Sequence, residues 1–156
     1  MTSEPIPQGS YRTAVTHGDL VYTAGMTPRV EGELLVSGRI GAQVDSDAAT
    51  AAIELATRNA IAAVDAVRGS RAVERVLQLT VYMACDADFT DHSRLADSAS
   101  AILFDTWPSA GLGARAAVGV STLPGGAPVE IQLVVALAAA TDSAACDARV
   151  RPCGPA

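Results

Sequence analysis

Residues 113–134 read GARAAVGVSTLPGGAPVEIQLV, and this stretch decides the fold class. Small and β-branched residues predict two strands, at 114–120 and 129–138. The Pro- and Gly-rich segment 123–128 is typical of a tight connection between them. The two strands follow each other so closely that they can pair as a hairpin.

Two charged side chains interrupt these apolar strands. Arg115 lies among alanines, glycines and valines, and Glu130 starts the last strand between apolar neighbours. Because charged groups are rarely buried without a partner, both are candidate functional residues. A guanidinium in such a setting can form a fork that receives a carboxylate. The other interpretation, which the residues leave open, is that Arg115 and Glu130 only bridge each other.

The middle of the chain predicts a helix, a strand and a second helix. Ala, Ile and Val recur at helical spacing behind an N-cap at Asp45 or Ser46, and Gly69 fits the left-handed position that closes the helix. A strand at 73–85 then alternates, with Leu77, Leu79, Val81 and Met83 on one face and Gln78, Thr80 and Tyr82 on the other. We expect Asp88 to cap the second helix, which ends before Pro108.

Two short strands at 11–15 and 20–24 precede these elements, with a loop at 26–38. The predicted order is strand, strand, helix, strand, helix, strand, strand. This order indicates an α+β two-layer sandwich, with two helices on one face of a mixed sheet. The other face stays uncovered unless a second subunit covers it. We expect a flexible arm at 1–9, one domain at 10–140 and a disordered tail at 141–156.

Composition excludes several classes of protein. The net charge is −6 and the basic residues are all Arg, which argues against nucleic-acid binding. No apolar run approaches the ~20 residues of a membrane span, and residues 1–9 lack the features of a signal peptide. Three cysteines without repeated spacing, Cys85, Cys146 and Cys153, favour a reduced, cytoplasmic protein.

Few other side chains are candidates for chemistry. His17 lies in a predicted turn and His92 beside the buried stripe of the second helix, and no third group with metal-ligand spacing accompanies them. We therefore predict no metal site and a structural role for both histidines. Cys85 closes a strand, where a small buried side chain is a more common role than a thiol nucleophile.

The sequence resembles the Rid (reactive-intermediate deaminase, YjgF-like) family over about residues 9–138. Residues 115–124, RAAVGVSTLP, followed by Val129-Glu130-Ile131, resemble the family's Arg-Ser-x-Val-x-Val-x-x-Leu-Pro and Ile-Glu-Ile motifs. Residues 18–25, GDLVYTAG, resemble its second-strand motif. Matches around Asn59, Thr80-Val81-Tyr82 and Asp88-Phe89 keep the same order.

The resemblance implies a chorismate-mutase-like fold that closes into a homotrimer, with a ligand pocket in each cleft between subunits. It implies hydrolysis of enamines and imines such as 2-aminoacrylate, which PLP enzymes release, to 2-oxo acids and ammonia. No cofactor or metal is implied. Arg115 would bind the substrate carboxylate and Glu130 would position the water. Tyr11 would be a catalytic pocket residue, and Gly25 and Met26 would contact the substrate.

Several positions depart from the family pattern and bear on the substrate. Arg12 follows the pocket tyrosine, Met26 replaces a frequent Gln, and Ala116 and Ala117 replace Ser and Cys. Arg12 can add charge near the cleft or simply lie on the surface. The alternatives are a non-catalytic carboxylate-binding trimer, a ribonuclease, and a tailoring deaminase or cyclisation aid in a specialised biosynthetic pathway.

Overall fold

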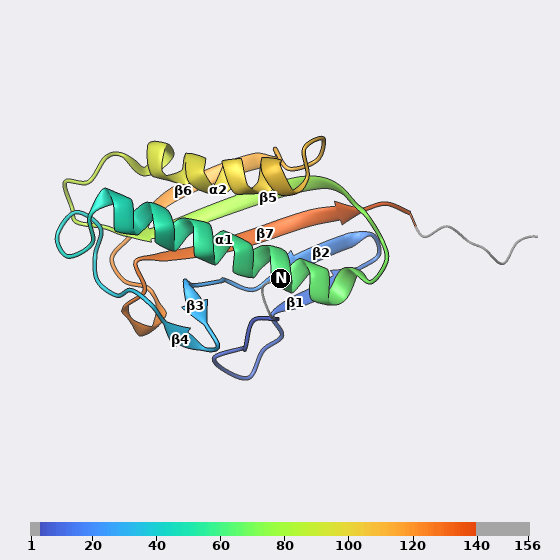
Figure 1. The fold of residues 1–156 in the computed structure, drawn as a ribbon, viewed down its shortest axis with the longest axis horizontal. Coiled ribbons are helices and arrows are strands. Elements are labelled where there is room, and N and C mark those ends of the chain that lie inside the picture. Colours follow the sequence, from blue (N-terminus) through green and yellow to red (C-terminus); the bar gives the residue numbers. More distant parts are fainter. Residues whose placement is uncertain (1–3, 140–156) are drawn as a thin grey trace, which may run out of the picture.

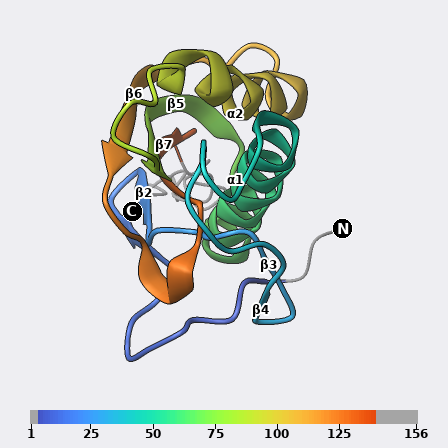
Figure 2. The ribbon, with the colours of Figure 1, turned by 90° about the vertical axis from the view of Figure 1, so that its left-hand side faces the viewer.

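The structure is a computed structural model that describes residues 4–139. Two helices lie on one face of a five-stranded sheet, and Figures 1 and 2 show the two layers from the front and from the side. The predicted α+β two-layer architecture is therefore confirmed. The elements run in the order β1 (Ala14–His17), β2 (Leu20–Thr23), β3 (Arg29–Val30), β4 (Glu33–Leu34), α1 (Ser46–Arg68), β5 (Val73–Ala84), α2 (His92–Thr106), β6 (Ala114–Val120) and β7 (Val129–Leu137), with a 3-10 turn at Pro124–Gly126.

The sheet has the order β1-β2-β7-β5-β6. Only β5 and β6 are parallel, because α2 carries the chain back between them; the other neighbours are antiparallel, so the sheet is mixed. The prediction that β6 and β7 pair as a hairpin is wrong, since β5 lies between them. Alternating apolar residues predict strands but carry no information on which strand lies beside which.

Helix α1 forms where its sequence pattern predicts it. The Asp45 side chain caps it by accepting a hydrogen bond from the Ala48 amide at 2.8 Å. Its buried stripe consists mostly of alanines, which let the helix lie close to β7. Gly69 follows with φ +59° and ψ −131°, so the positive φ is confirmed but the left-handed helical conformation is not.

Four local predictions need correction. Strand β1 begins at Ala14 rather than at residue 11, and the expected loop at 26–38 contains the small β3–β4 hairpin. Helix α2 begins after Asp91 rather than Asp88, so Asp88 does not cap it. A register shift between Val76 and Gln78 bulges the strand at Leu77, which is exposed.

The core lies between the helices and the sheet. Leu79, Val81 and Met83 of β5 and alternate residues of β7 are buried there, as predicted. No helix within residues 4–139 is both long and apolar enough to cross a membrane. The predicted tail at 141–156, with Cys146 and Cys153, lies outside the described residues, and the predicted domain boundaries stay predictions.

Candidate active site

Glu130 lies on the sheet face that the helices leave uncovered. Its neighbours Val129 and Ile131 are fully buried toward the helices, so the Glu130 side chain points the other way. Met26 and Ile131 exchange two backbone hydrogen bonds of 2.8 Å, which hold the segment after β2 against β7. The Glu130 carboxyl lies on the Cα of Gly25, where a Cβ would come within 2.0 Å of Oε1.

The Glu130 carboxyl has an unusual electrostatic setting. It is half-buried, and within residues 4–139 its oxygens make no hydrogen bond or ion pair. Burial therefore raises the pKa of Glu130 above its ordinary value, because the charged form loses hydration. A half-buried carboxyl group without a hydrogen-bond partner is suited to accept and return a proton.

Arg115 lies on the other face of the sheet. It pairs with Leu79 of β5, whose side chain faces the helices, and neighbouring residues in a ladder share a face. Its guanidinium contacts α2: Nη1 donates to Asp97 Oδ1 at 2.8 Å and to Ser100 Oγ at 3.0 Å, and Nη2 donates to the Ser93 carbonyl at 3.3 Å. The Arg115 side chain is 24% exposed.

Arg115 and Glu130 are consequently separated in one chain. Glu130 pairs with Tyr82 of β5, three positions along that strand from Leu79, and the two charged side chains project from opposite faces. The interpretation that Arg115 and Glu130 bridge each other is wrong. The ion-pair partner of Arg115 is Asp97.

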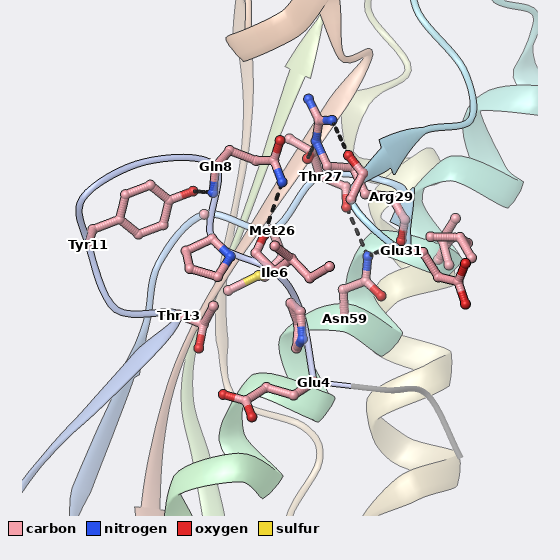
Figure 3. Close-up of a pocket in the computed structure, with 16 residues that line it drawn as sticks. Glu4, Ile6, Gln8, Tyr11, Thr13, Met26, Thr27, Arg29, Glu31 and Asn59 are labelled. Carbon is pink, nitrogen blue, oxygen red and sulfur yellow. Dashed lines mark hydrogen bonds between the residues drawn. The ribbon is translucent and has the colours of Figure 1, made fainter.

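Tyr11, Gly25 and Met26 line one cavity of about 80 Å³ beneath the N-terminal arm (Figure 3). Tyr11 is 49% exposed, and its hydroxyl accepts a hydrogen bond from the Gln8 amide at 3.1 Å. Asn59 of α1 fixes the opposite wall by donating to the carbonyls of Thr27 and Arg29 at 3.0 and 2.9 Å. Gly25 joins this cavity to the Glu130 carboxyl.

The sequence model of the endoribonuclease L-PSP family matches residues 1–137. The chain belongs to this family, which is also called YjgF/Rid. Protein TCP17 of Trypanosoma cruzi is 29% identical over 133 residues, which cover 84% of this chain and 83% of TCP17. The crystal structure of Atu1372 from Agrobacterium tumefaciens is 31% identical, with a TM-score of 0.78 and 83% of each chain covered. A structure from Shewanella oneidensis MR-1 is 25% identical, with a TM-score of 0.80, and the match covers 86% of this chain and 90% of that one.

The residues that hold Arg115 in this L-PSP family member were not among the candidates that the sequence predicted. Ser93, Asp97 and Ser100 stand at i, i+4 and i+7, so they form one polar stripe on α2. This spacing was visible in the sequence, next to the apolar stripe of the same helix. What the sequence did not contain was the position of β6 beside α2.

A second cavity of about 320 Å³ lies where β5 and β6 end, near the start of α2. Burial raises the pKa of its Cys85 to about 11, so this thiol is a poor nucleophile. His92 packs edge-on against Phe89 and lies close to Gly119, where a Cβ would come within 2.6 Å of Nε2. Within residues 4–139, no three His, Cys, Asp or Glu side chains are grouped to hold a metal ion.

Proposed function

We propose that this chain hydrolyses carboxylate-bearing enamines and imines, such as 2-aminoacrylate, to 2-oxo acids and ammonia without a cofactor. The observation that carries the proposal is the Glu130 carboxyl, which lies on Gly25 with a pKa raised by burial. Such a group can take a proton from water and return it within one catalytic cycle. The family match supports a shared ancestry with the YjgF/Rid proteins.

The chemistry needs orientation and a series of proton transfers. An enamine is first protonated on carbon by solvent to give an iminium ion. Water then adds to the iminium carbon while Glu130 takes a proton from the water, which yields a neutral carbinolamine. Glu130 returns this proton to the nitrogen, the C–N bond breaks and ammonia leaves, and the carbinolamine hydroxyl loses its proton to solvent as the carbonyl forms. The Tyr11 hydroxyl, in the cavity that Gly25 also lines, can hold the substrate nitrogen.

The site needs two subunits. A small substrate cannot contact Arg115 and Glu130 of one chain, because the sheet lies between their side chains. Arg115 lies on β6, which is an edge strand, so it is accessible to a second copy. We therefore propose that a closed homotrimer brings Arg115 of one subunit to Glu130 of the next, which agrees with the inter-subunit clefts that the family resemblance implies.

The uncovered sheet face supports this assembly. Tyr22 and Val118 are exposed there, and Tyr82 and Val134 are half-buried beside them. Apolar side chains gathered on one face favour association with another subunit. Thr80 on the same face is already buried within the chain, whereas Gln78 is exposed.

Light scattering at micromolar concentration should find a trimer, and a stable monomer would contradict the shared site.

The direct test measures ammonia released from 2-aminoacrylate that a PLP enzyme generates in the same solution. Wild type should accelerate release, and Arg115→Ala and Glu130→Gln should accelerate it much less. Binding of a small carboxylate without turnover would instead support the non-catalytic trimer. Turnover of larger carboxylate imines only would favour the tailoring deaminase, in which Met26 and Ala117 redirect specificity.

The family description favours a second candidate, an endoribonuclease. The charge balance argues against it, because 17 acidic residues outnumber 11 basic ones and phosphate neutralisation dominates binding to RNA. Incubation with a mixed RNA substrate should leave the RNA intact at enzyme concentrations that release ammonia. A cytoplasmic location, beside the PLP enzymes that would supply the substrate, remains a prediction.

A further inference from the structure

The Arg115 guanidinium is held on one side by three acceptors from a single helix. Asp97 Oδ1 at 2.8 Å and Ser100 Oγ at 3.0 Å both accept from Nη1, and the Ser93 carbonyl accepts from Nη2 at 3.3 Å. We call these three residues the α2 cradle. They stand one and two turns apart on the helix face toward β6, so the cradle is rigid along the helix axis.

Two N–H groups of the Arg115 guanidinium have no acceptor among the described residues. Arginine has five N–H groups in a planar fork. Asp97 and Ser100 take both hydrogens of Nη1, and Ser93 takes one of Nη2. Within residues 4–139, the Nε–H and the second Nη2–H have no acceptor. Two such N–H groups can donate in parallel to both oxygens of one carboxylate.

The charges of the pair are exposed to different degrees. The Asp97 side chain is 71% exposed, whereas that of Arg115 is 24% exposed. Asp97 therefore stays hydrated while it neutralises an arginine whose side chain is mostly covered. An exposed ion pair contributes little to stability, roughly 0–1 kcal/mol, so fold stability alone is a weak reason for this contact.

We propose that Asp97 and Ser100 are positioning residues, which fix the Nη1 end of Arg115 so that its opposite edge receives the substrate carboxylate. The inference rests on the proposed role of Arg115 in substrate binding. In this proposal the α2 cradle orients the guanidinium, and Arg115 contacts the substrate. Because Asp97 already balances the guanidinium charge, the site suits a substrate with one carboxylate rather than two.

The test measures binding, not turnover, with 2-oxobutanoate as a product-like monocarboxylate and its neutral amide as a control ligand. Calorimetry compares wild type with Asp97→Ala, Asp97→Asn, Ser100→Ala and Arg115→Ala. Asp105→Ala is the matched control, since Asp105 is an exposed carboxylate on the same helix. Melting temperature and subunit assembly are measured for every variant.

Asp97→Ala frees the Nη1 end of the guanidinium, and misplacement of such a contact should weaken 2-oxobutanoate binding about tenfold or more. Asp97→Asn keeps an acceptor oxygen and removes the negative charge, so its affinity should equal or exceed that of wild type. Ser100→Ala should have a smaller effect in the same direction as Asp97→Ala. Binding of the amide should not change in any of them.

The positioning role is overturned if Asp97→Ala binds 2-oxobutanoate as tightly as wild type, or more tightly, while Arg115→Ala does not bind it. In that case the proposed function stands, and Asp97 either has no role in substrate binding or competes with the substrate carboxylate for Arg115. Equal losses in Asp97→Ala and Asp97→Asn would also contradict positioning. If Arg115→Ala binds as well as wild type, the assignment of Arg115 fails, and the inference fails with it.

Discussion

The two charged residues of the candidate site are held in opposite ways. Arg115 has an ion pair and two further hydrogen bonds, all to α2. Glu130 has no ion pair or hydrogen bond among residues 4–139, and its carboxyl lies against the Cα of Gly25. Arg115, the proposed binding group, is thus oriented by hydrogen bonds, whereas the pKa of Glu130, the proposed proton-transfer group, is raised by burial.

The largest effect should come from Glu130→Gln. The amide keeps the shape of the side chain but cannot take a proton from water, so kcat should fall about 100- to 10,000-fold. Binding of 2-oxobutanoate to Arg115 should remain close to that of wild type. Glu74→Gln, an exposed acid on β5, is the matched control and should leave kcat unchanged. Full activity in Glu130→Gln would remove the proton-transfer role.

Arg115→Lys should impair the enzyme nearly as much as Arg115→Ala. Lysine keeps the charge, but it lacks the planar fork that contacts α2 and a carboxylate at once. A charge-assisted contact contributes about 1.5–3 kcal/mol, so kcat/KM should fall roughly 10- to 100-fold, mainly through KM. Steady-state kinetics measure this change. A lysine variant with wild-type KM would contradict the bidentate contact.

Gly25→Ala should disturb Glu130 without touching Arg115. The added Cβ would lie 2.0 Å from Oε1, so the carboxyl must move, and kcat should fall by about tenfold. In the Glu130→Gln background the same substitution should add little, because coupled residues are not additive. A double-mutant cycle measures this coupling. Independent effects would show that Gly25 acts on something other than Glu130.

The smallest predicted effect concerns the pH dependence of stability. Burial raises the folded-state pKa of Glu130, so its contribution is fully present below the unfolded pKa of about 4.3 and is lost as pH rises through the raised value. Glu130→Gln should therefore melt above wild type at pH 7 and at nearly the same temperature as wild type near pH 4. Thermal unfolding at both pH values measures it. A lower melting temperature at pH 7 would show that the carboxylate is stabilised.

Helix α1 and strand β6 were predictable from local sequence, whereas the neighbours of each strand were not. The alanine spacing of α1 and its Asp45 cap are local signals, and the helix lies where they place it. Strand β6 also has its predicted bounds. The position of β5 between β6 and β7 depends on tertiary packing, and so does the bulge at Leu77.

In the candidate site, too, single residues were predictable and their arrangement in space was not. Arg115 and Glu130 were conspicuous because each is a charge in an apolar strand. Their placement on opposite faces was hidden, because it follows from the order of three strands. The α2 cradle was hidden for the same reason, since a polar helix face has meaning only when its neighbour is known.

Mixed assemblies of two impaired variants test the shared site most directly. Arg115→Ala and Glu130→Gln subunits are unfolded together at equal concentration and refolded, and ammonia release is compared with that of each variant alone. A site built from two subunits regenerates intact Arg115–Glu130 combinations at about a quarter of the interfaces of a cyclic trimer, so a similar fraction of wild-type activity should return. A mixed assembly that is as inactive as its components would contradict the shared site.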